Sequence, residues 1–101
     1  MEVSLGAIPF DLDFHPSSPI VASGLINGDL HLYRYSVGSR PERVFEINAH
    51  GEESCRAVRF ADSGKKTTVA SGDDEGCIKV WIPDSMLVAT PLMPMKIMSL
   101  T

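Results

Sequence analysis

Val21-Ala22-Ser23-Gly24 recurs as Val69-Ala70-Ser71-Gly72, and this repeated tetrapeptide decides the fold. A segment that ends in phenylalanine precedes each copy, at Phe14 and at Phe60. A tight turn and a segment that ends in another aromatic residue follow each copy, at Tyr33 and at Trp81. A repeat at a spacing of about 20–50 residues is one supersecondary unit that buries its hydrophobic face by stacking on a neighbour. We therefore predict stacked repeats and, since such stacks form binding surfaces, an interaction protein.

Alternation of apolar and polar residues predicts strands in both copies. Phe10, Leu12 and Phe14 alternate with Asp11 and Asp13, which is the period of a half-buried strand. The short apolar run 19–24 predicts a strand that is buried on both faces. By the same reading we expect strands over 30–35, 44–47, 57–60, 67–71 and 77–82. The predicted fold class is all-β, with four strands in the first copy and three in the second.

Two tight turns join strands within the copies. Asn27-Gly28 follows the first tetrapeptide, and an Asn-Gly pair favours a type I′ hairpin turn because both central residues need a positive φ. Glu75-Gly76 takes the corresponding place after the second tetrapeptide. We therefore predict one hairpin turn at each of these pairs.

These patterns divide the chain into four parts. An N-terminal segment, 1–9, precedes a first unit over 10–48 and a second unit over 49–82 that lacks its last strand. The tail, 83–101, is irregular and rich in methionine and proline. Codons for Met93–Ser99, read one base out of frame, can encode Asn-Ala-His-Glu-Asp-Tyr-Val, which begins like the second unit. One hypothesis is that the tail is an out-of-frame reading of a third unit in a truncated isoform.

Composition narrows the class of partner. The 101 residues carry a net charge of −4, which supplies no basic face for nucleic acid and no attraction to anionic membranes. The first residues lack the basic start and apolar run of a signal peptide, and no apolar stretch reaches the roughly 18 residues of a membrane-spanning helix. Cys55 and Cys77 are therefore expected to be free thiols in an intracellular, reducing compartment.

The second unit resembles the WD40 repeat family. His50 stands near its start, Ser71-Gly72 lies on the second expected strand, and Ile78-Lys79-Val80-Trp81 lies on the third. The family folds as a β-propeller of four-stranded blades, typically 4–8 in a ring. The resemblance covers 10–81, or about two blades, and implies an incomplete β-propeller. The first unit matches more loosely, because Tyr33 replaces the tryptophan.

The resemblance also implies a buried hydrogen-bond network within the second blade. In the family a histidine, a serine or threonine, a tryptophan and an aspartate form this network. The corresponding residues of this sequence are His50, Ser71 and Trp81, with Glu75 in the place of the aspartate. The expected role of these residues is structural.

The run 8–24 resembles the N-terminal blade of a group of nuclear WD40 proteins. That likeness implies location in the nucleus and nucleolus, and a link to ribosome biogenesis or, in plants, to cullin-4 ubiquitin ligases. Docking on the cullin-4 adaptor uses a Trp-Asp-x-Arg/Lys motif, which neither Trp81-Ile82-Pro83-Asp84 nor Tyr33-Arg34-Tyr35-Ser36 supplies. Contact with that adaptor is therefore expected only in a full-length form.

Histidines and cysteines are the first candidates for chemistry. His50 and Cys55 form a candidate nucleophile pair, because a neighbouring imidazole lowers the pKa of a thiol. His15, His31 and Cys77 join these two as candidate zinc ligands, but no close pair such as C-x₂-C is present. Since the repeat already explains His50, we expect no catalytic residue, cofactor or metal.

Charged clusters are the second group of candidates. Asp11 and Asp13 share one face of a strand but lack any sign of the cleft and unlike environments that catalytic carboxylates need. The acidic turn Asp73-Asp74-Glu75 suits a cation or a basic peptide, or is a solvated hairpin loop. Ser63-Gly64-Lys65-Lys66 holds too few lysines for a nucleic-acid surface and is expected to be a local loop.

The function expected from these observations is that of a non-catalytic scaffold for other proteins, without direct contact to nucleic acid or membrane. One alternative is a stand-alone β domain that binds a peptide by strand addition at an open sheet edge. Another is an unstable truncated product without independent activity, because repeat proteins generally need at least about three units for stability.

Overall fold

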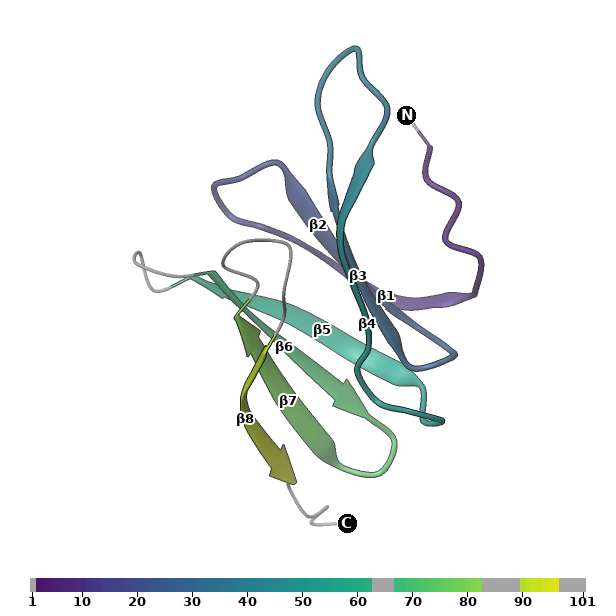
Figure 1. Ribbon diagram of the computed structural model, residues 1–101, viewed down its shortest axis with the longest axis vertical. Helices are drawn as coiled ribbons and strands as arrows, with labels where there is room; N and C mark the ends of the chain where they lie inside the picture. Colours follow the sequence, from purple (N-terminus) through teal and green to yellow (C-terminus); the bar gives the residue numbers. More distant parts are fainter. Residues whose placement is uncertain (1, 63–66, 83–89, 97–101) are drawn as a thin grey trace.

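Two antiparallel sheets of four strands each follow one another along the chain (Figure 1). This computed structural model describes the backbone of residues 2–62, 67–82 and 90–96 and the side chains of residues 2–61 and 67–82. Within these ranges there is no helix with the length and apolarity to cross a lipid bilayer. The all-β fold class predicted from the repeat is therefore confirmed.

We call the two sheets blade 1 and blade 2, and in each of them the strands lie in sequence order. Blade 1 comprises β1 (Pro9–Phe14), β2 (Ile20–Leu25), β3 (Asp29–Arg34) and β4 (Glu42–Asn48). Blade 2 comprises β5 (Cys55–Asp62), β6 (Thr67–Asp73), β7 (Cys77–Ile82) and β8 (Thr90–Lys96). Each blade is a simple up-and-down meander, because short loops join strands that are neighbours in the sheet.

Strand β8 corrects the prediction that the second unit lacks its last strand. It pairs with β7 in antiparallel register, with Pro91 opposite Trp81 and Pro94 opposite Lys79. Proline has no N–H to donate, so it is confined to edge strands and irregular positions of a sheet. The two prolines that interrupt the apolar pattern of the tail are therefore compatible with an edge strand.

The hairpin turns form at the predicted pairs but have three-residue loops. In blade 1 the amide of Gly28 donates to the carbonyl of Leu25 at 3.1 Å, and Gly28 has a φ of 91°. Gly76 closes the corresponding loop of blade 2 with a φ of 81°. A turn followed by a left-handed residue is the usual three-residue hairpin. The two-residue type I′ turn predicted at Asn27-Gly28 is therefore wrong.

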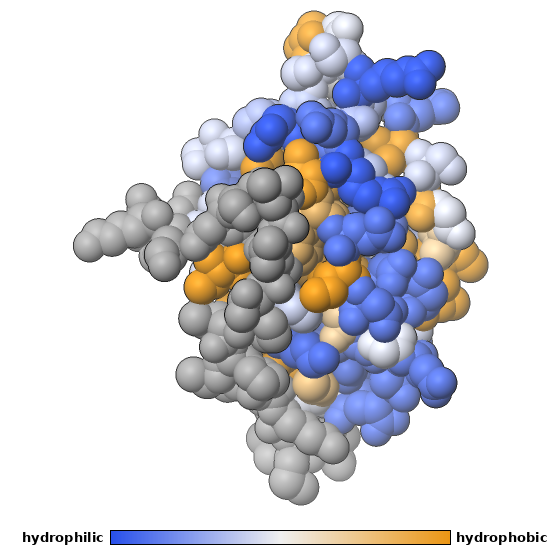
Figure 2. Space-filling model, in the orientation of Figure 1, coloured by the Kyte–Doolittle hydropathy of each residue, from blue (hydrophilic) through white to orange (hydrophobic). Residues whose placement is uncertain are grey.

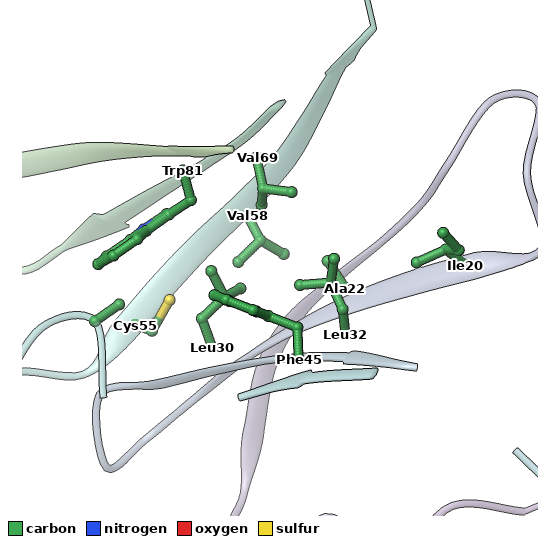
Figure 3. Close-up of a cluster of buried hydrophobic side chains, with 10 residues drawn as sticks. Ile20, Ala22, Leu30, Leu32, Phe45, Cys55, Val58, Val69 and Trp81 are labelled. Carbon is green, nitrogen blue, oxygen red and sulfur yellow. The ribbon is translucent and has the colours of Figure 1, made fainter. Parts of the chain in front are cut away.

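One hydrophobic core lies between the two blades (Figure 3). Its fully buried members on the blade 1 side include Ala22, Leu30 and Leu32, and those on the blade 2 side include Val58 and Val69. Figure 3 shows these side chains pointing toward one another from the two sheets. Since each sheet buries one face against the other, neither blade has a core of its own.

Gly24 lies where the backbone of blade 1 comes close to that of blade 2. A Cβ atom at this position would lie 2.7 Å from the carbonyl oxygen of Cys55 and 2.8 Å from its sulfur. No side chain larger than hydrogen fits there without displacing backbone. At Gly72, its counterpart in blade 2, a Cβ would have no neighbour nearer than 3.9 Å among the residues whose side chains the structure describes. The repeated glycine is therefore a steric requirement in blade 1 only.

Candidate functional site: the joint between the blades

A buried hydrogen-bond network joins the loop before β5 to the middle of blade 2. His50 Nε2 lies 2.8 Å from Ser71 Oγ, and Trp81 Nε1 donates to the same oxygen at 3.0 Å. His50 Nδ1 lies 2.8 Å from a carboxylate oxygen of Asp73. His50, Ser71 and Trp81 are all buried. The structure thus brings together three of the four residues that the family resemblance selected.

Asp73, rather than Glu75, takes the fourth place in this network. The side chain of Glu75 is exposed, while its amide and that of Cys77 donate to Asp73 Oδ1 at 2.9 and 3.1 Å. Burial raises the pKa of Asp73, but these amides and His50 outweigh it and hold the pKa below its ordinary value. The shorter side chain stands at the end of β6, directly beside the imidazole, which is why it replaces the glutamate.

Ser71, His50 and Asp73 have the connectivity of a hydrolase triad but not its access. With Asp73 as acceptor, Nδ1 carries the imidazole proton and Nε2 accepts from the serine hydroxyl. Burial lowers the pKa of His50 and favours this neutral form. Ser71 is only 1% exposed, and its hydroxyl oxygen already accepts a hydrogen bond from Trp81. The arrangement therefore holds the blade together instead of presenting a nucleophile.

Cys55 is a buried thiol and not an activated one. Burial, followed by the charges of Asp11 and Asp73, raises its pKa to about 12. A thiol with so high a pKa stays protonated at neutral pH, whereas nucleophilic cysteines form thiolates. Both cysteines are free, and Cys55 packs in the core. The proposed pairing of His50 with Cys55 as a nucleophile has no support in this geometry.

Asp11 and Asp13 connect β1 of blade 1 to β5 of blade 2. Asp11 accepts from the amide of Val58 at 3.0 Å and from Arg59 Nη1 at 2.6 Å, and Asp13 accepts from the amide of Phe60 at 2.8 Å. Burial raises the pKa of Asp11, but the bonds from Val58 and Arg59 outweigh it and lower the pKa. These carboxylates accept hydrogen bonds from backbone amides on the edge of β5 that has no neighbouring strand, so their role is structural.

The apolar face of β1 is turned away from blade 2. Leu12 and Phe14 are 52% and 60% exposed, whereas their counterpart residues in β5 lie in or against the core. The strand forms as predicted, but none of its residues is fully buried, and its acidic face is the one that meets the second blade. Hydrophobic side chains also reach the surface among hydrophilic ones on the face drawn in Figure 2. Blade 1 therefore presents an apolar surface without a neighbouring sheet among the described residues.

A hollow of about 360 Å³ lies on this open face of blade 1. The blade 1 hollow is lined by Val3, Leu5, Leu12, Phe14, Val21, Ser23, Tyr33, Tyr35 and Pro41. Ser23 Oγ is buried in it without a hydrogen-bond partner among the described residues. In blade 2 the corresponding Ser71 is paired with a histidine. The hollow therefore resembles the face of blade 2 that packs against blade 1, but it has no histidine bonded to its serine among the described residues.

The five histidines and cysteines considered as candidate zinc ligands do not gather in one place. His15 Nε2 bonds to Thr67 Oγ1 at 3.0 Å, so this ring also links the two blades. Ligand atoms come within 4.8 Å of one another in two groups among the described residues: His50, Asp73 and Cys77, and Asp29, His31 and Glu46. Both nitrogens of His50 are already hydrogen-bonded in the first group. Sequence spacing could not reveal the second group, because Glu46 reaches it from another strand.

The aspartates of the acidic turn 73–75 have different environments. Asp73 belongs to the buried network, while Asp74 forms an exposed ion pair of 2.7 Å with Arg56. An exposed pair of this kind contributes about 0–1 kcal/mol. The expected basic loop at 63–66 lies outside the described residues.

The geometry of blade 2 agrees with a sequence-family match. Residues 41–81 match the family described as "WD domain, G-beta repeat". Residues 41–81 are a WD40 repeat. The match includes β4 of blade 1, so a WD40 sequence repeat is offset by one strand from the structural blade, and it contains every member of the buried network.

Curated relatives extend the likeness to blade 1. WD repeat-containing protein 55 of Arabidopsis thaliana is 40% identical over 121 aligned residues that cover 80% of this chain and 34% of the relative. The protein of the same name from Danio rerio is 35% identical over 71% of this chain and 19% of its own length. The chain therefore spans about a third or less of these relatives.

A solved structure agrees with the fold. The crystal structure of Saccharomyces cerevisiae Sqt1 superposes on 89% of this chain with a TM-score of 0.73, at 21% sequence identity. The superposed region is 23% of the Sqt1 chain. At this identity the likeness concerns the fold alone, and it supports the arrangement of two four-stranded blades.

Proposed function

We propose that the protein is a non-catalytic scaffold that joins further WD40-type blades and other proteins through the open face of blade 1. The observation that carries the proposal is an equivalence within the chain. Leu12, Phe14, Val21, Ser23 and Tyr33 line the blade 1 hollow, and Val58, Phe60, Val69, Ser71 and Trp81 are their counterparts in blade 2. The second set is covered by blade 1, whereas the first set has no covering sheet among the described residues.

The same equivalence specifies the chemistry of the partner. Blade 1 covers blade 2 with an apolar sheet face and with two carboxylates that accept hydrogen bonds from the amides of Val58 and Phe60. The loop between the blades adds His50, which is bonded to Ser71. A partner for the hollow should therefore carry an apolar strand face, an Asp-x-Asp pair that reaches the amides of Leu12 and Phe14, and a histidine for Ser23. A second copy of this chain fits poorly, because Ala57 and Arg59 replace the two aspartates on its free blade.

A binding experiment tests this proposal directly. The part of the Arabidopsis relative that this chain does not cover serves as the partner in a pull-down with the purified chain. We expect capture, and we expect Leu12→Asp with Phe14→Asp to abolish it, because two charges would be buried in an apolar contact. Val37→Asp is the matched control, since Val37 is fully exposed and does not line the hollow. Equal capture by both variants would contradict the proposed face.

The finer assignment rests on resemblance to WD repeat-containing protein 55. We propose a nuclear or nucleolar location and a role in ribosome biogenesis, with contact to a cullin-4 ligase adaptor only in a longer form. Imaging of a tagged chain, together with measurement of ribosomal RNA precursors after its depletion, tests this assignment. A cytoplasmic chain whose loss leaves the precursors unchanged would oppose it.

Strand addition at an open edge is the second candidate. Strand β4 (Glu42–Asn48) has a single neighbour in its sheet, β3, so its outer backbone groups are available as a template for an extended peptide. A monodisperse monomer that melts cooperatively and binds peptides without further blades would favour this function. Aggregation that added blades relieve would favour the truncated product instead.

A further inference from the structure

We propose that Asp29, His31 and Glu46 form a binding site for a divalent transition metal, with Zn²⁺ as the best-suited ion. Asp29 and His31 lie two residues apart on β3, so their side chains leave the same face of the strand. Glu46 lies directly opposite His31 in the pairing of β3 with β4. The strand register thus gathers one imidazole and two carboxylates at one point of blade 1.

The distances suit a tetrahedral ion. His31 Nε2 lies 3.5 Å from Asp29 Oδ2 and 3.4 Å from Glu46 Oε2, and all three atoms are within 4.8 Å of one another. Zinc bonds to nitrogen and oxygen of about 2.0–2.2 Å place tetrahedral ligand atoms roughly 3.3–3.6 Å apart. The two separations from the imidazole fall in this range.

The imidazole nitrogen that faces the carboxylates has no other partner. His31 is only 2% exposed, and its Nε2 makes no hydrogen bond in the described part of the chain. Burial, with a contribution from Arg43, lowers the pKa of His31 despite the two carboxylates, which favours the neutral ring. A neutral imidazole offers a lone pair to a metal, whereas a protonated one cannot bind it.

Each ligand is held from behind by a second residue. Nδ1 of His31 lies 3.3 Å from the hydroxyl of Tyr33, Asn48 donates to Asp29 Oδ1 at 2.9 Å, and Arg43 donates to Glu46 Oε1 at 3.0 Å. These contacts use the atoms that point away from the cluster and leave Nε2, Oδ2 and Oε2 directed toward a common point. Such outer contacts orient the ligands of protein metal sites.

Access and ligand type select the ion. The Glu46 side chain is 50% exposed, so an ion can enter from solvent and complete its coordination with water. An imidazole favours zinc and other transition metals over magnesium and calcium. Blade 2 does not repeat the site, because Cys77 and Lys79 replace Asp29 and His31.

Isothermal titration of the metal-free chain with ZnCl₂ tests the site. We expect about one Zn²⁺ per chain, and a loss of affinity of at least ~10-fold in Glu46→Gln and in His31→Gln, on the scale of losses at metal sites. Glu42→Gln is the matched control, because Glu42 is exposed on the same strand. Circular dichroism of each variant verifies folding, and the half-exposed Glu46 keeps the test valid if His31→Gln unfolds.

Three outcomes would overturn the proposal. The first is no binding at millimolar zinc, which would leave the cluster as an ion-paired histidine. The second is binding that Glu46→Gln does not weaken. The third is loss of binding in Cys77→Ser, or a thiolate charge-transfer band after replacement by Co²⁺, which would place the ion at His50, Asp73 and Cys77. Capture of further blades is a separate readout, so failure here leaves the proposed scaffold function untouched.

Discussion

Asp13 of blade 1 accepts a hydrogen bond from the amide of Phe60 in blade 2 at 2.8 Å, so a carboxylate takes the place of a neighbouring strand. Strand β5 is an edge of its sheet, and unpaired amides on an edge are a template for aggregation. Asp11 repeats the contact two residues earlier, at Val58. The alternating aspartates of β1, which suggested one buried and one solvated face, therefore also align the two blades.

Asp13→Ala should lower the free energy of unfolding by about 1–3 kcal/mol, because it leaves the amide of Phe60 without its partner. Asp13→Asn should lose less, since its carbonyl still accepts. Urea denaturation followed by tryptophan fluorescence measures both. Asp74→Ala is the control, because it removes an aspartate from an exposed ion pair with Arg56. Equal losses in Asp13→Ala and Asp74→Ala would contradict the role of Asp13.

Gly24→Ala should destabilise the protein by about 1–3 kcal/mol through overpacking against the backbone of Cys55. Gly72→Ala is its counterpart in the repeat and should change stability by less than about 0.5 kcal/mol or increase it slightly, because its methyl group has room. Thermal melts of the two variants give the comparison. A larger loss at Gly72 would show that the two blades do not meet as described.

Ser71→Ala should cost about 1–3 kcal/mol, because His50 and Trp81 would both lose the oxygen that they share. Ser23→Ala alters the corresponding residue of blade 1, whose hydroxyl has no partner in the described chain, and should be close to neutral or stabilising. Urea midpoints of the two variants test the asymmetry. Equal losses would mean that the hydroxyl of Ser23 is also satisfied.

Stability should fall as the pH drops from 7 to 5. In the folded chain the pKa values of His31 and His50 are lowered from 6.5. As the pH falls below about 6.5, these histidines therefore bind protons more readily in the unfolded chain than in the folded chain, which favours unfolding. Their contribution is fully present above 6.5 and is lost as the pH falls through the lowered values. Melting temperatures measured with a chelator present should show this decline, and His31→Gln should reduce its slope. A flat profile between pH 7 and 5 would contradict it.

A second loss of stability should occur at more acidic pH. Asp11 and Asp73 have pKa values held below 3.8, so their stabilising contribution is present above that value and disappears as the pH falls toward the lowered pKa. Urea midpoints at pH 4.5 and 3 measure this step. Asp11→Asn should reduce the change between these two pH values, and an unreduced change would contradict the role of Asp11.

The sequence alone determined the two repeats, the all-β class and most strands, because strand period and turn residues are local properties. It also selected His50, Ser71 and Trp81, since their spacing within one repeat is characteristic of the family. It missed β8, because the prolines at 91 and 94 break the apolar pattern without preventing pairing at a sheet edge.

The tertiary structure decided which faces meet. Alternation along β1 separates acidic from apolar side chains, but only the position of β5 shows that the acidic face is the one in contact with the next blade. The choice of Asp73 over Glu75 depends on which carboxylate reaches the imidazole, a distance that sequence spacing does not contain. The cluster at Asp29, His31 and Glu46 likewise depends on the register between β3 and β4. The period of a strand is a property of neighbouring residues, whereas these contacts join residues that are brought together only by strand pairing and by the packing of the sheets.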